Sequence, residues 1–288
     1  MDEIISKAAT LLEALPYIQR FRSQIFVVKY GGSFMDSPDP EIRHRVARDV
    51  VFLEAVGINP VVVHGGGRAI SRAVEAAGLK PAFVQGHRVT DAATAKIVDQ
   101  VLSREINPEI VQAIQDFGGK ARGFAGTEIF CCRKLVQDEG ADLGFVGDVY
   151  EVNTEPLREC IRRSVTPVVS PTALGDDGQV YNCNADLAAA KTAIALKARR
   201  LVFMSDVPGL LRDPKKDKTL VRHLAVAEVP ALKESGIIDR GMIPKVDSAV
   251  AAIESGVEKV QFVDGRIPHS VLLEIFTDAG VGTEVVLS

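Results

Sequence analysis

The sequence has few cysteines, and none of them lies at a spacing that binds metal. Its 288 residues include Cys131, Cys132, Cys160 and Cys183, without a CxxC pair or a His-Cys pattern. The sequence therefore predicts reduced, buried thiols in a cytoplasmic protein and assigns no residue to a metal ion.

The sequence also lacks an excess of basic charge and any apolar run long enough to cross a membrane. Its formal net charge is −4, so neither a nucleic acid nor an anionic membrane is expected as a partner. The first residues are acidic and lack the basic and apolar regions of a signal peptide. These absences favour a soluble protein that binds small molecules, with enough chain for one large domain or two lobes.

What the sequence does contain is a regular alternation of strand and helix patterns. Runs rich in Val, Ile and Phe alternate with segments whose apolar residues recur three and four apart. The predicted strand segments are 25–32, 59–67, 166–170, 200–207 and 259–264, and the helices are 3–22, 41–57, 68–78, 91–117, 185–198 and 245–256. This order predicts an α/β sandwich around a parallel sheet, with right-handed crossovers.

Two of these strands run directly into glycine-rich turns. The stretch VVVHGGGRAI at 61–70 places His64 and three glycines after one strand, and Lys29, Gly31 and Gly32 end the other. Neither turn has the spacing of a dinucleotide fingerprint or a P-loop. Ligands of open α/β sheets bind beyond the carboxyl ends of the strands, where backbone N–H groups can hold a phosphate or carboxylate. Tight packing of helix on sheet is the alternative explanation of a single such turn.

Three charged residues accompany these turns. Lys29 lies in a strand that reads as buried, where an unpaired ammonium is strongly disfavoured. Lys245 begins a helix, where the dipole disfavours a cation, and Asp186 lies in the first turn of another helix. Each has an ordinary alternative: a lysine stem that reaches the surface, an exposed lysine, or a helix-capping carboxylate.

Together these residues fit phosphoryl transfer. Lysines would cancel phosphate charge, glycine N–H groups would hold the oxygens, and a carboxylate would orient the lysines. An acceptor that is already an anion needs no catalytic base. The pattern therefore points to a carboxylate acceptor and an acyl phosphate product.

Motifs spread over nearly the whole chain resemble the amino acid kinase family. They are KYGGS, VVVHGGG, GHRVTD, LGFVGDV, NCNAD, SDVPGLL and GMIPKV. The resemblance implies a three-layer αβα sandwich with two lobes around a mainly parallel sheet. Within the family, it is strongest to enzymes that phosphorylate the side-chain carboxylate of N-acetyl-L-glutamate with ATP and Mg²⁺, in arginine biosynthesis. It implies an oligomerisation and regulatory helix at 1–24, an acceptor-binding and dimerisation lobe at 25–196, and a lobe at 197–288 that binds ATP and arginine.

The same resemblance assigns roles to single residues. The catalytic residues it implies are Lys29, Lys245 and Asp186. The phosphate-binding residues are Gly31, Gly32 and Gly66. The acceptor-binding residues are Gly66, Gly67, Arg88, Asn182 and Asn184, among which the planar fork of arginine suits a carboxylate. The nucleotide-binding residues are Ser205, Asp206, Val207, Gly209, Leu210 and Lys245.

Both ends of the chain carry a further expectation. The first helix has an apolar stripe without an obvious core to cover: Ile4, Ile5, Ala8, Leu11, Leu12 and Leu15. Resemblance to arginine-sensitive relatives implies a hexamer, a trimer of dimers joined through this helix. It also implies an L-arginine site made by Tyr17, His269, Glu274, Gly280 and Gly282. From the residues alone, a helix packed on its own lobe and a surface glutamate are the alternatives, and a nitrogen-signalling partner protein is left open.

Four segments depart from the family pattern. Ser33 and Phe34 replace the usual Asn-Ala, and His87 precedes Arg88 where leucine is usual. Arg240 precedes Gly241 where a second glycine is common, and AGTEIFCCRKL stands where SGKDG is expected. None of these removes a proposed catalytic residue, but they leave other functions open. The alternatives are a kinase for an N-acylated aminoadipate or another small anion, and a non-catalytic arginine-sensing module.

Overall fold

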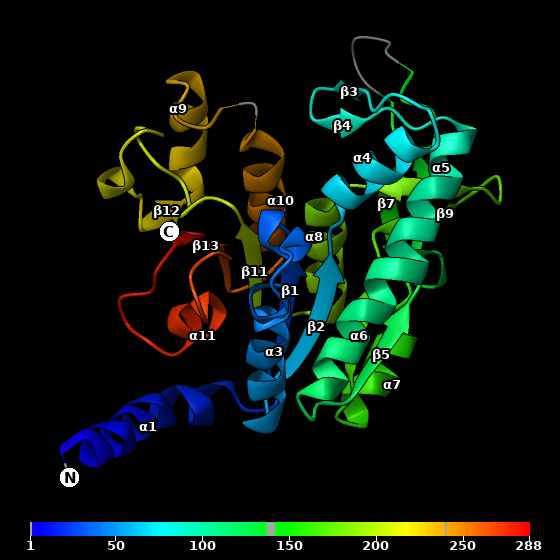
Figure 1. Ribbon diagram of the computed structural model, residues 1–288. Coiled ribbons are helices and arrows are strands. Elements are labelled where there is room, and N and C mark those ends of the chain that lie inside the picture. Colours follow the sequence, from blue (N-terminus) through cyan, green and yellow to red (C-terminus); the bar gives the residue numbers. More distant parts are fainter. Residues whose placement is uncertain (1, 137–141, 240) are drawn as a thin grey trace.

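The middle layer of the protein is one eight-stranded sheet in the computed structural model, which describes residues 2–136, 142–239 and 241–288 (Figure 1). Its strands lie in the order β12-β14-β13-β11-β1-β2-β8-β5. Their bounds are β1 Ile25–Tyr30, β2 Asn59–His64, β5 Ala121–Phe124, β8 Thr166–Val169, β11 Arg200–Ser205, β12 His223–Ala225, β13 Lys259–Asp264 and β14 Thr283–Val286. Within this described sheet, every neighbouring pair is parallel except β13–β14, so the predicted mainly parallel sheet is confirmed.

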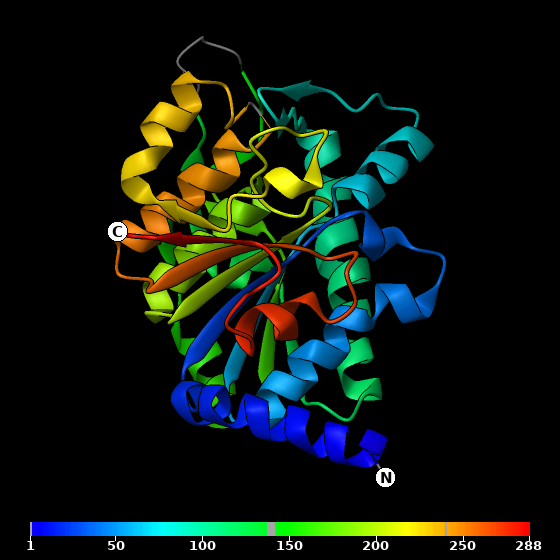
Figure 2. The same cartoon turned by 90° about the vertical axis from the view of Figure 1, so that its left-hand side faces the viewer.

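Helices cover both faces of the sheet and complete the expected three-layer sandwich (Figure 2). One face is covered by α7 Glu155–Arg162, α8 Ala185–Leu196, α9 Val229–Glu234 and α10 Ile243–Glu254. The other is covered by α3 Arg45–Ala55, α6 Asn107–Asp116, α11 Ser270–Ile275 and the end of α1 Asp2–Phe21. Short α2 Pro40–Arg43 precedes α3, while α4 Gly67–Ala76 packs with α5 Ala92–Asp99 beyond the carboxyl end of β2.

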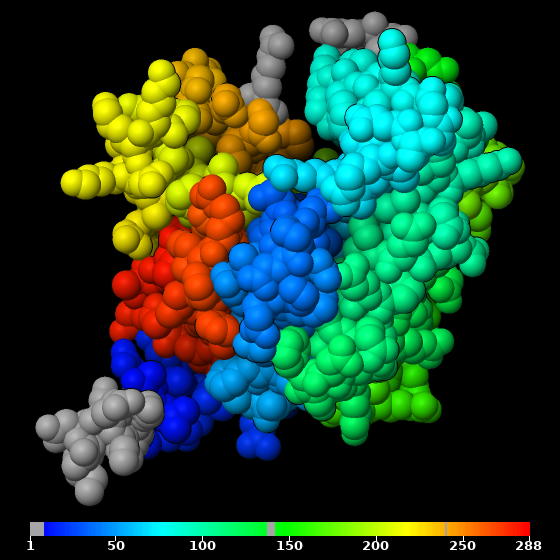
Figure 3. All heavy atoms as spheres, viewed as in Figure 1, coloured from blue at the N-terminus to red at the C-terminus, as the bar shows by residue number. Residues whose placement is uncertain are grey.

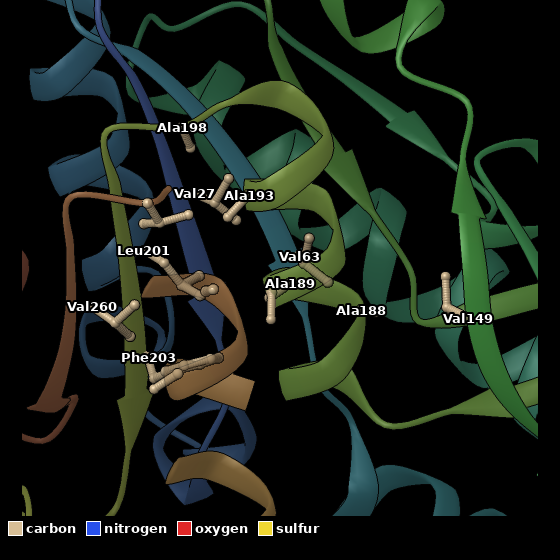
Figure 4. Close-up of a cluster of buried hydrophobic side chains, with 14 of the residues drawn as sticks. Val27, Val63, Val149, Ala188, Ala189, Ala193, Ala198, Leu201, Phe203 and Val260 are labelled. Atoms are coloured by element: carbon tan, nitrogen blue, oxygen red, sulfur yellow. The ribbon is translucent and has the colours of Figure 1, made fainter. Parts of the chain in front are cut away.

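Alternation along the strands divides the core into two. Val27 of β1 joins the cluster beneath α8 and α10, whereas Phe26 and Val28 join the cluster beneath α3 and α6. Figure 4 shows Val27, Val63 and Ala189 in the first cluster, contributed by β1, β2 and α8. Because both faces of the sheet are covered, its central strands read as continuous apolar runs.

Four further strands close into a small barrel that is absent from the sequence prediction. It contains β6 Phe130–Lys134, β7 Val146–Val152, β9 Thr172–Gly175 and β10 Val180–Cys183. A separate hairpin pairs β3 Phe83–Val84 with β4 His87–Arg88. Three of the four cysteines, Cys132, Cys160 and Cys183, are buried as expected, whereas Cys131 is partly exposed.

Two predicted helices are subdivided in the structure. The segment 41–57 forms α2 and α3, separated at His44, and the segment 91–117 runs through α5, a π-helix at Gln100–Ile106 and α6. A π-helix widens the helical turn by one residue and often lies beside a functional site. None of the described helices is both long and apolar enough to cross a membrane.

The first helix projects from the body of the protein (Figures 1 and 3), and it carries exposed leucines. α1 continues through Pro16, although a proline inside a helix removes one backbone hydrogen bond. Phe21 at its end is fully buried, whereas Leu11 and Leu12 are 69% and 68% exposed. Ile4, Ile5 and Ala8 also belong to the predicted stripe, but their side chains are not among those that the structure describes.

The proposed lobe boundary falls in the turn between α8 and β11. Lys197 closes α8 in the left-handed conformation, with φ 54°, and β11 then pairs in parallel with β1. The sheet is therefore continuous across the boundary. The division into segments 1–24, 25–196 and 197–288 stays a prediction.

We predict that Gly126→Ala strongly destabilises the fold. A Cβ at this position would lie 1.9 Å from the Thr172 carbonyl oxygen and 2.2 Å from that of Ser170. Such overpacking against backbone should cost roughly 2–3 kcal/mol of unfolding free energy, measured by urea denaturation. Gly118→Ala is the matched control, because its φ of +84° is strained but no atom lies within 4 Å. Equal losses in the two variants would contradict the steric explanation.

Candidate functional site

One carboxylate joins the two lysines that the sequence analysis singled out. Asp186 Oδ1 lies 3.0 Å from Lys29 Nζ, and Asp186 Oδ2 accepts a hydrogen bond of 2.9 Å from Lys245 Nζ. Lys29 comes from β1, Asp186 from the first turn of α8 and Lys245 from the first turn of α10. The structure thus brings together all three residues predicted as catalytic.

Burial and neighbouring charges shift the pKa values of Asp186 and Lys245 in opposite directions. Burial by itself raises the pKa of Asp186, but the two lysine charges outweigh it and hold the pKa well below its usual range. Burial lowers the pKa of Lys245, while the charge of Asp186 opposes that shift. Asp186 is therefore an anion at neutral pH, and its lowered pKa makes it a weak base.

The glycine turns after β1 and β2 pack tightly beside the cluster. A Cβ on Gly31 would lie 2.5 Å from Lys29 Nζ, so glycine is what leaves room for the ammonium group. Gly32 has φ 136°, a conformation that favours glycine, and Gly66 is the N-cap of α4. With Lys29, Asp186 and the second turn, these glycines line a cavity of about 280 Å³.

The acceptor-binding residues predicted from the resemblance line the same cavity: Gly66, Gly67, Arg88, Asn182 and Asn184. Arg88 is buried, and its Nη2 donates to the Gly67 carbonyl oxygen at 2.7 Å and to Ser71 Oγ at 2.8 Å. Its Nη1 is buried and has no hydrogen-bond partner among the described residues. One guanidinium nitrogen is therefore held in place while another remains for an anionic ligand.

The two asparagines have structural contacts of their own. Asn182 Nδ2 donates to Thr90 Oγ1 at 3.2 Å. Asn184 caps α8, because its Oδ1 accepts from the backbone N–H of Asp186 at 2.8 Å. That cap fixes the turn from which Asp186 projects, a role that the NCNAD motif alone did not reveal.

A larger cavity, of about 740 Å³, lies on the other side of the second glycine turn. Gly32, Gly66, Gly67, Phe83 and Arg88 line both cavities. The larger one is otherwise lined mainly by α2, α3, α4, the π-helix and α6, together with the 3-10 turn Ser33–Asp36 and Asp206. Sequence reasoning missed it, because it exists only where these separate helices meet.

The predicted nucleotide segment follows β11, beside the first glycine turn. Asp206 accepts hydrogen bonds of 2.7 Å from both the backbone N–H and the hydroxyl of Ser33, which links the loops after β1 and β11. Ser205 Oγ is buried and without a partner among the described residues, and Gly209 has φ 145°. Leu210 belongs to the core, whereas Val207 is 40% exposed.

Four of the five residues predicted to bind arginine line a separate small cavity, of about 120 Å³: Tyr17, Glu274, Gly280 and Gly282. Tyr17 donates from its hydroxyl to Asp278 across this cavity. His269 is not part of the lining and instead places Nδ1 2.6 Å from Asp49 Oδ1.

Glu274 is already well occupied by hydrogen bonds. Its Oε2 accepts from the N–H groups of Val281 and Gly282, at 2.7 and 3.0 Å, and its Oε1 accepts from Gln261 Nε2 at 3.0 Å. A bidentate guanidinium would have to share these oxygens. Sequence analysis missed Gln261, because this glutamine lies inside a strand and belongs to no recognisable motif.

The sequence profile of the amino acid kinase family matches residues 24–264. The chain belongs to the amino acid kinase family. Among curated proteins, it is 46% identical to "Acetylglutamate kinase" of Heliobacterium modesticaldum, covering 99% of each chain. It is 48% identical to the protein of the same name from Methanocaldococcus jannaschii, covering 99% of this chain and 98% of the relative. The family-level prediction and the prediction of a kinase are thereby confirmed.

Solved structures agree with this membership of the amino acid kinase family. An N-acetylglutamate synthase of Neisseria gonorrhoeae, complexed with coenzyme A and N-acetyl-glutamate, superposes with a TM-score of 0.85 at 26% identity. The match covers 97% of this chain but 63% of the synthase. A carbamate kinase of Giardia, with a TM-score of 0.65, 14% identity and coverage of 92% and 99%, shows the shared fold.

We predict that Asp186→Asn lowers kcat by about 10²-fold or more, because the lysines lose their organising charge. Without that charge, the pKa of Lys245 falls further below its usual value. Residual activity should therefore increase as the pH is lowered, in a kinase assay from pH 9 to pH 6. Asp49→Asn, another buried carboxylate at 1% exposure, is the control and should keep kcat and its pH profile. A normal pH profile in Asp186→Asn would refute this coupling.

Proposed function

We propose that this kinase transfers the γ-phosphoryl group of ATP to the side-chain carboxylate of N-acetyl-L-glutamate, as a step of arginine biosynthesis. The observation that best supports this proposal is the Lys29–Asp186–Lys245 cluster beside two glycine turns, in a chain of the amino acid kinase family. The names of relatives at 46–48% identity over 97–99% of this chain support the choice of acceptor.

The reaction needs little covalent chemistry from the protein. The acceptor carboxylate attacks the γ-phosphorus, the bond to the bridging oxygen of ADP breaks, and ADP leaves with the electron pair. Lys29 and Lys245 offset the negative charge that spreads over the phosphoryl oxygens, and the N–H groups of Gly32 and Gly66 hold those oxygens. Asp186 keeps both ammonium groups aimed and charged. No proton is removed from the acceptor, so no catalytic base is required.

The two substrates occupy opposite sides of this cluster in our proposal. The α-carboxylate of the acceptor pairs with Arg88, near Asn182 and Asn184, within segment 25–196. ATP lies along 205–210 in segment 197–288. Mg²⁺ arrives with the nucleotide, since the described residues hold no group of three metal-binding side chains and Mg²⁺ is commonly bound through substrate phosphates.

Two other functions make different predictions. A kinase for an N-acylated aminoadipate would need room for one more methylene, and His87 beside Arg88 departs from the usual family residue. A non-catalytic arginine-sensing module is favoured by the structural likeness to an N-acetylglutamate synthase complexed with coenzyme A and L-arginine, with a TM-score of 0.81 at 26% identity. The intact ion-pair cluster argues against it.

A hydroxamate assay separates these functions. Purified protein with ATP and Mg²⁺ should form the acyl phosphate, trapped by hydroxylamine, from N-acetyl-L-glutamate at least tenfold faster than from N-acetyl-L-aminoadipate. The reverse preference would overturn the acceptor assignment. A complete lack of turnover with either acid, in protein that still binds arginine, would favour the sensing module.

We predict in the same assay that Arg88→Lys raises the KM for N-acetyl-L-glutamate, by about tenfold or more, because a point charge cannot replace a bidentate fork. The KM for ATP should stay within about twofold of wild type. Arg68→Lys, on the neighbouring turn of the larger cavity, is the matched control and should change neither constant. An effect of Arg88→Lys on ATP alone would mean that the acceptor carboxylate lies elsewhere.

We further propose feedback inhibition by L-arginine in a hexamer assembled through α1. Support comes from the cavity between α1 and the C-terminal segment, where Tyr17 faces Asp278 and Glu274 faces Gly282. The exposed Leu11 and Leu12 offer α1 an apolar surface for a second subunit. Arginine bound in this cavity would link helix position to activity, which is allosteric coupling between two sites.

We predict that Leu11→Glu combined with Leu12→Glu converts the hexamer to active dimers with blunted inhibition by arginine. Charge on this surface would oppose helix pairing, while turnover should stay within about twofold, because α1 lies far from the catalytic cluster. Multi-angle light scattering and arginine titrations provide the measurements. Leu287→Glu, which alters another exposed leucine, should keep the wild-type mass. A dimeric, arginine-insensitive wild type would refute the regulatory proposal and leave the catalytic one intact.

A further inference from the structure

A buried histidine and asparagine lie directly behind the second glycine turn. His64, the last residue of β2, is fully buried and sits immediately before Gly65. Its Nδ1 lies 2.9 Å from the Gly65 carbonyl oxygen, and its Nε2 lies 3.2 Å from Asn107 Nδ2. Neither side chain lines the cavity of the catalytic cluster, so neither can touch the substrates there.

The contacts of Asn107 determine which nitrogen of His64 carries the proton. Asn107 Nδ2 also donates to the Val168 carbonyl oxygen at 3.0 Å, which identifies it as the amide nitrogen. An amide nitrogen cannot accept a hydrogen bond, so His64 Nε2 must be the acceptor and Nδ1 must carry the hydrogen. Burial lowers the pKa of His64 to about 4, so the ring is neutral at physiological pH. Nδ1–H therefore donates to the Gly65 carbonyl oxygen.

Hydrogen bonds hold Gly65 on both sides. Its N–H donates to the Tyr30 carbonyl oxygen at 2.7 Å, and its carbonyl oxygen accepts from His64. In a trans peptide, the C=O of one residue and the N–H of the next point in opposite directions within one plane. Holding the Gly65 carbonyl toward His64 therefore fixes the direction of the Gly66 N–H.

The π-helix supports this arrangement from the other side. A Cβ on Gly66 would lie 2.5 Å from Ile106 Cδ1 and 2.7 Å from Leu102 Cδ2, so this segment packs directly on the turn. Asn107 follows the π-helix at the start of α6 and is 3% exposed. Gly123 leaves space for it, because a Cβ there would lie 2.1 Å from Asn107 Oδ1.

We propose that His64 and Asn107 are positioning residues that aim the Gly66 N–H at the phosphoryl group during transfer. The role rests on the proposed function, in which Gly66 donates to that group. A donor that is fixed in advance needs no reorganisation when charge develops, so its contribution falls on the transition state. Loss of the Nδ1–H donor should lower kcat and leave both KM values nearly unchanged.

Two substitutions of His64 separate positioning from packing. The amide nitrogen of His64→Asn can occupy the place of Nδ1 and donate to Gly65. The amide of His64→Gln reaches the place of Nε2, where its oxygen can accept from Asn107 Nδ2, and leaves the Gly65 carbonyl oxygen without its donor. We expect kcat of His64→Asn within about threefold of wild type and kcat of His64→Gln lower by about 10²-fold, with KM values within twofold. Asparagine leaves the larger void, so His64→Asn should be the less stable of the two in urea denaturation. Equal activities, or a less active His64→Asn, would overturn the proposal.

The tautomer itself can be tested on the unmodified protein, which covers the case of a variant that does not fold. Solid-state NMR of sedimented protein labelled with ¹⁵N only at its five histidines should show a neutral His64 ring protonated at Nδ1 from pH 8 to pH 5.5. Its signal is identified by its loss in His64→Gln, because His269 also places Nδ1 on an acceptor, Asp49. In Asn107→Leu, which removes the donor to Nε2, this signal should shift or split. An Nε2–H tautomer for His64 would refute the positioning network. This result does not depend on the acceptor, so it is distinguishable from a failure of the proposed function.

Discussion

The ion pairs of Asp186 with two lysines are the interaction on which the site depends. Two ammonium groups, that of Lys245 buried and that of Lys29 largely shielded from water, would repel each other and lose hydration. One carboxylate between them offsets both costs. The cluster has one positive charge left over, which suits a polyanionic ligand. Its geometry needs β1, α8 and α10 to meet at one edge of the sheet. That meeting follows from the strand order, since β1 lies between β2 and β11.

Much of this edge could be predicted from the sequence, because long buried strands and the turns after them leave strong local patterns. Lys29 and Asp186 were found in this way, since a charge in or beside an apolar run requires an explanation. The small barrel left no such signal, because three of its four strands have only four or five residues and because its strands mix polar with apolar residues. The π-helix was also invisible, because its one-residue widening hardly changes the spacing of apolar residues.

The remaining features depend on contacts between distant segments. His269 and Glu274 belong to the same predicted set, yet only Glu274 lines the cavity, while His269 turns to Asp49 on α3. Sequence spacing cannot distinguish them, because α11 separates their side chains only once it is folded against the sheet. The pairing of His64 with Asn107 is hidden for the same reason. Neither residue belongs to a motif that names the other.

The continuous ladder between β1 and β11 restricts how the enzyme can move. Phe26 to Lys29 pair in register with Arg200 to Phe203, mostly in the buried core, where breaking backbone hydrogen bonds is costly. Segments 25–196 and 197–288, which contain β1 and β11, therefore cannot rotate about a hinge as independent bodies. With the substrates placed as we propose, their approach would come from changes in sheet twist and from the loops after the strands. Those loops meet at Ser33 and Asp206. The motion would therefore be a bending of one continuous sheet and not a hinge motion of two lobes.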